Sequence, residues 1–120
     1  MAAPNVVNVL TITGKTDVQA DIGLTPTAIV TNAAASDDLY KVNTLVISNS
    51  NDSDLTVTAT VDLFRSSTPY LLASNISLVA GASLDVLSSA VYLEEGDSLR
   101  ITCNDSDSLD AIASYEIITD

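Results

Sequence analysis

The chain has no histidine, no tryptophan and a single cysteine, Cys103, among its 120 residues. The commonest general base and the usual thiolate and imidazole zinc ligands are therefore missing, and no internal disulfide bond can form. These absences exclude most hydrolase and transferase mechanisms, so we do not expect an enzyme. Because Cys103 alternates with the apolar residues Leu99 and Ile101, we expect it to be a small core residue.

Basic residues are also scarce. The 4 lysines and arginines stand against 16 aspartates and glutamates, which gives a formal net charge of −12. A charge of this sign repels phosphate backbones and anionic lipid head groups, so we expect no nucleic-acid partner and no membrane partner. It suits a basic protein surface, although a solvated charged exterior has the same composition.

Long apolar runs are missing as well, and none approaches the length that spans a bilayer. The start, Met1–Asn5, has neither the basic residues nor the apolar stretch of a signal peptide. We therefore expect a soluble protein that is made in the cytoplasm. A chain of 120 residues predicts one domain, which buries roughly two thirds of the surface of its unfolded chain.

The clearest pattern that is present is a strict alternation. From Leu55 to Leu63, every second residue is apolar and each residue between them is polar or charged. A period of two places all the apolar side chains on one face of a pleated strand, so the pattern predicts an antiparallel strand with one wet face. The same alternation returns in residues 99–103 and 111–117.

Turn residues recur about every ten positions and divide the chain into eight or nine short strands. We expect turns or loops at residues 16–25, 32–38, 49–54, 66–69, 94–97 and 104–108. We expect strands at residues 5–13, 27–31, 39–48, 55–65, 70–73, 84–87, 91–93 and 98–103, with a last strand that ends at Ile117. Between two of these strands, Ile76, Leu78 and Ala80 alternate toward Gly81. This spacing predicts an all-β fold, an antiparallel β-sandwich of about eight strands, and it fits an immunoglobulin-like and a jelly-roll topology equally well.

The first predicted strand is apolar on both faces. Val7 and Val9 lie on one face, and Val6, Leu10 and Ile12 lie on the other. Such a strand is either an edge strand of its own sandwich or one that contacts a neighbouring subunit. Within a single domain of residues 1–120, residues 1–25 are thus an N-terminal strand and loop, and these five residues are the candidate partner interface.

Paired carboxylates are the remaining candidates for catalytic acid–base groups. Glu94 with Glu95, and Asp105 with Asp107, lie in turns rich in glycine, asparagine and serine, where side chains are exposed. A catalytic carboxyl needs burial to raise its pKa, so we predict turn residues and no catalytic site. Arg65 and Arg100 are expected to pair with the acidic excess.

The motif Asn51–Asp54 reappears as Asn104–Asp107. Alternate carboxylates can converge on a hard cation such as calcium. The candidate ligands are Asp52, Asp54, Asp105 and Asp107. Neither stretch has EF-hand spacing, and the same residues are favoured in tight left-handed turns. We therefore assign no metal and no cofactor, and the four aspartates remain calcium candidates.

From Thr27 to its end the chain resembles, in order along the sequence, a group of small virion structural proteins of tailed bacteriophages, especially phages of marine bacteria and cyanobacteria. The similar stretches are Tyr40–Asn43, Val61–Arg65, Ala80–Val86, Tyr92–Arg100 and Ser114–Ile118.

The resemblance implies a β-sandwich module that occurs many times in each particle and works by assembly. A capsid decoration or cement protein that stabilises the assembled head fits best, because the chain is one domain with no fibre repeat and no coiled-coil heptads. The implied partners are the major capsid protein or other virion proteins, with the chain bound to the lattice or as a homo-oligomer. Its location would be the virion, after synthesis in the host cytoplasm.

Two alternatives remain open from the sequence. The chain is an adaptor or knob of the neck, tail or fibres, which copy number would distinguish from a decoration protein. Alternatively, it is a carbohydrate-binding, adhesin-like sandwich. The lack of tryptophan argues against that class, because sugar faces stack on aromatic rings and the chain offers mainly its four tyrosines.

Overall fold

The computed structural model describes residues 11–51 and 54–119 of the chain. This part folds into nine β-strands without any helix. The strands are β1 (Thr11–Ile22), β2 (Thr27–Thr31), β3 (Asp38–Asn49), β4 (Val57–Arg65), β5 (Thr68–Leu78), β6 (Ser83–Asp85), β7 (Val91–Leu93), β8 (Ser98–Cys103) and β9 (Leu109–Thr119). Within these described ranges, no helix is long and apolar enough to cross a membrane.

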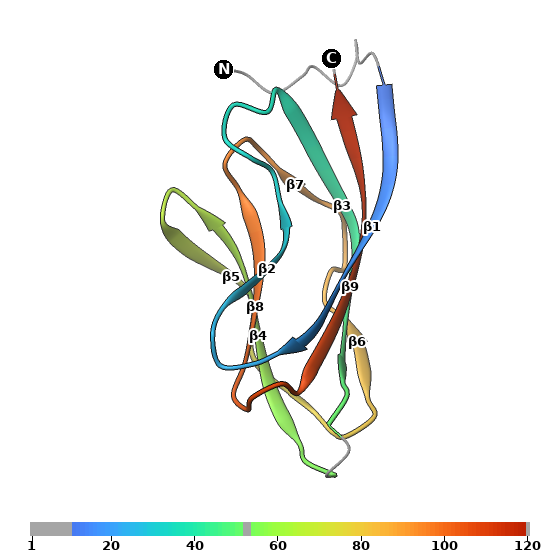
Figure 1. The fold of residues 1–120 in the computed structure, drawn as a ribbon, viewed down its shortest axis with the longest axis vertical. Coiled ribbons are helices and arrows are strands. Elements are labelled where there is room, and N and C mark those ends of the chain that lie inside the picture. Colours follow the sequence, from blue (N-terminus) through green and yellow to red (C-terminus); the bar gives the residue numbers. More distant parts are fainter. Residues whose placement is uncertain (1–10, 52–53, 120) are drawn as a thin grey trace.

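The strands form two antiparallel sheets packed face to face, so the predicted β-sandwich is confirmed (Figure 1). One sheet has the order β1-β9-β3-β6, with β7 also paired to β3, and the other has the order β2-β8-β4-β5. The pairing is nested: β1 pairs with β9, β2 with β8, β3 with β6 and β7, and β4 with β5. Nested pairing of this kind is the jelly-roll arrangement, which decides between the two topologies that the sequence allowed.

The core lies between the sheets and consists of the apolar residues that alternate along the central strands. On β4 these are Val57, Ala59 and Val61, and their cross-strand neighbours on β8 include Ile101 and Cys103, all buried. The prediction that Cys103 is a core residue is confirmed. Each fully buried aliphatic side chain of this kind contributes about 1.5–3 kcal/mol to folding.

Strand β1 differs from the prediction. Residues 16–22 were expected in a loop, but β1 runs through Gly14 and Lys15 to Ile22 and pairs with β9 along most of that length. It is an edge strand whose side chains are mostly exposed, so its backbone pairing needs no alternation of polar and apolar residues. Of the predicted strand at residues 5–13, residues 5–10 lie outside the described part.

Two further boundaries needed correction. β5 continues to Leu78, whereas the predicted strand ended at Ala73, and its register with β4 shifts twice, between Ala59 and Val61 and between Val61 and Asp62. These bulges interrupt the alternation from which the sequence boundaries were drawn. Leu55 was predicted to open β4, but it precedes the strand and is exposed.

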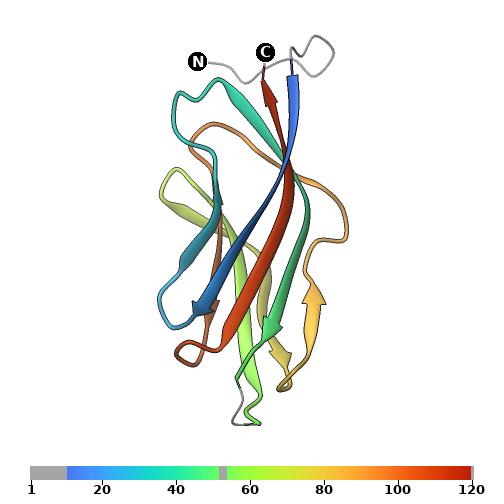
Figure 2. The ribbon, with the colours of Figure 1, turned by 45° about the vertical axis from the view of Figure 1, so that its right-hand side comes forward.

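The loops gather at the two ends of the sandwich, and the β4–β5 hairpin projects from its side (Figures 1 and 2). At one end, the loop between β2 and β3 lies against the turn between β7 and β8. At the other end, the loops that follow β1, β3 and β8 meet. Most of the candidate functional residues lie at these two ends of the sandwich and on the β4–β5 hairpin.

Candidate functional site

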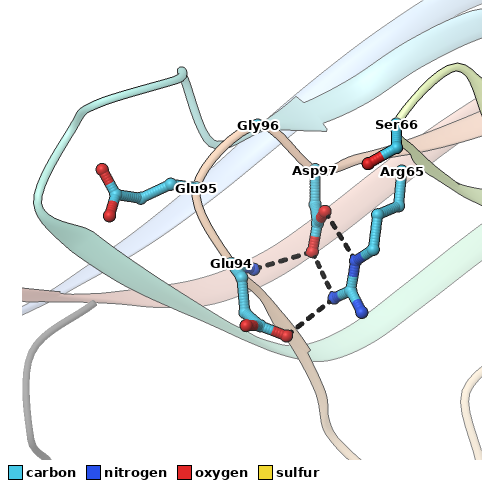
Figure 3. Close-up of a pocket in the computed structure, with 6 residues that line it drawn as sticks. All are labelled: Arg65, Ser66, Glu94, Glu95, Gly96 and Asp97. Atoms are coloured by element: carbon cyan, nitrogen blue, oxygen red, sulfur yellow. Dashed lines mark hydrogen bonds and ion pairs between the residues drawn. The ribbon is translucent and has the colours of Figure 1, made fainter. Parts of the chain in front are cut away.

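A charged cluster joins the end of β4 to the turn between β7 and β8 (Figure 3). Arg65 Nε donates to Asp97 Oδ1 at 2.9 Å, and Arg65 Nη2 donates both to Asp97 Oδ2 and, at 2.9 Å, to Glu94 Oε2. Asp97 is only 2% exposed and also accepts a hydrogen bond from the backbone N–H of Glu94. Hydrogen bonding to Asp97 raises the pKa of the Arg65 guanidinium, which therefore stays charged.

The turn that carries Asp97 is fixed by a buried asparagine. Gly96 adopts a φ of +89°, and its N–H donates to the backbone carbonyl of Asn32. The Asn32 side chain, itself fully buried, donates through Nδ2 to the carbonyls of Leu93 at 2.9 Å and Asp38 at 3.0 Å. Asn32 thus ties the β2–β3 loop to the β7–β8 turn, and it was not identified from the sequence.

Glu95 turns away from the arginine, as Figure 3 shows. Its Oε2 accepts a hydrogen bond from the backbone N–H of Asp37 at 3.1 Å, and its Oε1 is buried with no hydrogen-bond partner among the described residues. The two predicted turn carboxylates, Glu94 and Glu95, therefore do not face one another and form no acid–base pair.

An open depression of about 340 Å³ lies over this cluster. It is lined by Arg65, Ser66, Glu94, Glu95, Gly96 and Asp97. Its guanidinium and two of its carboxylates are engaged with one another. The pairing of Arg65 with the acidic excess is confirmed, while Asp97 is buried although the turn was expected to be exposed. What this geometry provides is a rigid turn held by ion pairing.

The second arginine is paired in a similar way on the outer face of the β2-β8-β4-β5 sheet, where β8 and β4 lie side by side. Arg100 Nε donates to Asp62 Oδ1 at 3.0 Å and Arg100 Nη2 donates to Asp62 Oδ2 at 3.2 Å. The guanidinium also lies over the Phe64 ring, 3.8 Å from its centroid, which is a cation–π contact. Asp62 was expected on a wet face, but these contacts leave it only 4% exposed.

The two acidic motifs are brought together at the end of the sandwich opposite the Arg65 cluster. Asn51 Nδ2 donates to Asp105 Oδ2 at 3.4 Å and to Ser108 Oγ at 3.1 Å. Ser108 Oγ in turn donates to Asp105 Oδ2 at 2.6 Å. Asp105 is thus held by neutral donors, and nothing in the sequence indicated that the two repeats meet.

The other calcium candidates do not join this contact. Asp54 and Asp107 are exposed and adopt positive φ values of 59° and 56°, the left-handed turn conformation considered from the sequence. Asp52 lies outside the described residues. In residues 11–51 and 54–119, no group of three or more acidic or thiol side chains is arranged to hold a metal ion.

Of the five candidate interface residues, only Ile12 lies in the described part. Val6, Val7, Val9 and Leu10 lie outside it. Ile12 is 57% exposed on β1, and Val18, further along the same face of that strand, is 72% exposed. The cross-strand neighbour of Val18 is Ile112, which is also exposed, so apolar side chains stand on the outer face of this sheet.

A second exposed apolar group was not identified from the sequence. Tyr70, Leu71 and Leu72 follow one another on β5 and are 56%, 61% and 41% exposed. They belong to β5, whose hairpin with β4 projects from the side of the sandwich in Figure 2. The sequence contains one indication of this group that was not used: no charged residue lies between Arg65 and Asp85.

Comparison with known proteins does not assign the chain to a family. No model of a protein family matches it, and no curated protein matches it either.

Proposed function

We propose that the chain is a structural protein of a tailed-bacteriophage virion, and that it decorates the assembled head. The support is the resemblance that runs from Thr27 to the end, together with a jelly-roll sandwich, an architecture also used by viral capsid domains. A shared architecture is an analogy only, so the surface residues carry the structural part of the proposal.

The observation that carries it is a row of apolar side chains on the outer face where β1, β9 and β3 lie side by side. Val18 and Ile112 are exposed neighbours in this row, and the half-buried Val46 extends it onto β3 beside Ile112. Ile12 is exposed on the same face of β1, beyond Gly14 and Thr16. Apolar residues in adjacent positions on an exposed sheet face are typical of surfaces that another protein covers. In the proposal, this face and residues 1–10 contact the major capsid protein or another virion protein.

Binding of this kind stabilises a shell without any chemistry. A protein that binds the assembled lattice, and not its free subunits, shifts the equilibrium toward the lattice by mass action. The acidic surface, with its net charge of −12, would favour a basic rim around the contact on the capsid.

Particles that lack this protein provide the test. Purified wild-type protein added to them is expected to bind and to raise the temperature at which they release their genome. Deleting residues 1–13 should abolish binding, and Val18→Asp should weaken it by at least about tenfold, because a charge would be buried in the contact. Leu84→Asp, an equal charge change at an exposed residue of β6, is the control. Unchanged occupancy with the deletion and with Val18→Asp would refute the β1 contact, and failure of the wild-type protein to bind would refute the decoration role.

Placement in the neck, tail or fibres is the alternative within the same class. Closed rings there contain on the order of a dozen subunits, whereas a decorated lattice contains hundreds. The number of copies per particle therefore separates the two placements.

A further inference from the structure

Ile118, near the end of β9, is a buried apolar residue that lies outside the core. It is only 5% exposed, yet it does not belong to the buried cluster that the two sheets enclose. On β9 that cluster includes Ala113 and Tyr115, and the alternation of a strand places Ile118 on the opposite, outer face of the sheet. The second sheet therefore does not account for the burial of Ile118.

Ile112, on the same face of the same strand, shows how exposed an uncovered isoleucine is there. Both isoleucines lie between one apolar residue of β1 and one of β3, but Ile112 is 48% exposed. The flanking residues of Ile112 are Val18 and Val46, and those of Ile118 are Ile12 and Leu39. Each flank of Ile118 is larger by one methylene group only, which is too little to lower the exposed fraction from 48% to 5%.

The neighbouring row of side chains can cover Ile118 from one direction only. That row consists of Gly14, Glu116 and Lys41. On the other side, toward the strand ends, the next positions of the same orientation on β1 and β9 are residues 10 and 120. Both lie outside the part of the chain that the structure describes, so on that side the register of residues 11–51 and 54–119 supplies no cover.

The segment that enters β1 has the composition and the length of such a cover. Residues 1–10 contain no charged side chain, and residues 5–10 are apolar on both faces of an extended chain. The segment joins β1 at Thr11, whose register partner is Thr119, directly after Ile118, and β1, β9 and β3 reach the same end of the sandwich (Figure 1). Six extended residues span about 20 Å, whereas the distance across from β1 to β3 is about 10 Å.

We propose that residues 5–10 fold back across the outer face of their own sheet and cover Ile118. One face of the segment packs on the row of Ile12, Ile118 and Leu39, and the other points away from the molecule. The outward face would then add apolar side chains to the surface that binds the virion lattice. This last step rests on the proposed function, whereas the contact within the chain does not depend on it.

Labelling of an introduced thiol with a maleimide tests the contact in the full chain, without any particle. Cys103 is buried, so it adds little background. Ile118→Cys is expected to react at least about tenfold more slowly than Ile112→Cys, because the segment must open before the reagent can enter. Deleting residues 2–10 should remove this difference. Equal rates in the full chain, or protection of Ile118→Cys that survives the deletion, would overturn the proposal.

Substitutions within the segment repeat the test without shortening the chain. Val9→Asp combined with Leu10→Asp places one charge on each face of the segment, so burying either face is opposed. This pair should make Ile118→Cys react as fast as the deletion does. Ala2→Asp combined with Ala3→Asp is the control, because it adds the same charge before residue 5 and should leave the protection intact. Protection that persists in the first pair would contradict the contact.

Thermal unfolding provides an independent measurement with a matched control. In the full chain, Ile118→Ala should lower the melting temperature by at least about 4 °C, because a buried side chain is truncated. The fall should be less than half as large in the chain that lacks residues 2–10, where Ile118 is already exposed. Ile112→Ala, exposed in both chains, should have the same effect in each. An equal fall for Ile118→Ala in the two chains would refute the cover.

These measurements are separate from the test of the decoration role. Protection of Ile118→Cys in a protein that does not bind particles would leave the contact within the chain intact and refute only the lattice contact. Binding to particles by a protein in which Ile118→Cys and Ile112→Cys react equally fast would do the reverse.

Discussion

Single residues in this fold matter most where a polar group is buried with its partner. Tyr115 is only 4% exposed, stacks on Tyr40 with ring centroids 5.5 Å apart, and donates its hydroxyl hydrogen to Asp17 Oδ2 at 2.7 Å. Burial first, and then this hydrogen bond, raise the pKa of Tyr115 above its ordinary value of 10.0. Burial likewise raises the pKa of Tyr40.

These raised pKa values predict a loss of stability at alkaline pH. Below about pH 10 both tyrosines are protonated in the folded and the unfolded chain, so their contribution is fully present. Above it the unfolded chain ionises first, and the free energy of unfolding falls as the pH rises toward the folded pKa. Denaturant unfolding as a function of pH should show a smaller fall for Tyr115→Phe than for the wild-type protein, with a cost of about 1.5–3 kcal/mol at neutral pH. An identical alkaline slope in both proteins would contradict this interpretation.

The Arg65 cluster gives a second prediction at this scale. Asp97→Asn removes a buried carboxylate that accepts from Arg65 and from the Glu94 backbone, and is expected to lower the free energy of unfolding by about 1.5–3 kcal/mol. Glu94→Gln changes a side chain that is 63% exposed and should cost less than about 1 kcal/mol. Equal costs for the two variants in urea unfolding would mean that burial of Asp97 does not set the strength of the pair.

At the scale of elements, the contact between the β1–β2 and β8–β9 loops is the tightest described approach at a glycine. A Cβ added to Gly23 would lie 2.9 Å from the backbone N of Asp107 and 3.1 Å from Cα of Ser106, whereas a Cβ on Gly14 would meet nothing within 4 Å. Gly23→Ala is expected to destabilise the fold by about 1–3 kcal/mol, because the clash is with backbone atoms. Gly14→Ala, measured in the same thermal unfolding experiment, should change stability by no more than about 0.5 kcal/mol. A neutral Gly23→Ala would show that the two loops can separate freely.

The acidic loops at that end give a prediction about ligands. Asp54 and Asp107 are exposed, and Asp105 is occupied by the donors Asn51 and Ser108, so calcium is expected to produce no titration heat and no rise in melting temperature. A saturable heat that is lost in Asp105→Asn would reverse that expectation and restore the four aspartates as a calcium site.

How far the sequence predicted the elements depends on where each element lies. The bounds of β2, β7 and β8 agree with the prediction, because their apolar residues face the core at a period of two or their ends carry clear turn residues. β1 was cut short at Gly14 because an exposed edge strand is held by backbone pairing, which leaves no hydropathy pattern. β5 was cut short at Ala73 because its bulges break the alternation there.

Side-chain contacts, like the strand bounds, were predictable from the sequence only in part. The charge balance predicts that Arg65 and Arg100 pair with carboxylates. It does not predict which of the 16 acidic residues the fold brings near each arginine. Asn32 and Asn49 look like ordinary turn residues, yet each donates from a buried position to carbonyls of two separate segments. Such roles depend on which loops meet, and that depends on the nested strand pairing.

For the whole molecule, the proposed role is one of contact with other proteins, and it rests on the acidic composition and on the exposed apolar residues of β1 and β9. The surface proposed for the virion lattice is confined to one face of one sheet, which suits a module that occupies equivalent positions in a symmetric assembly.

The number of copies of this chain in purified particles is the first quantity to determine, by quantitative mass spectrometry against the major capsid protein. Decoration of the whole lattice predicts a ratio to the capsid protein near one to one, or one to a small integer. A few copies per hundred capsid subunits would instead place the chain in the neck, tail or fibres. Its absence from particles would contradict the structural role altogether.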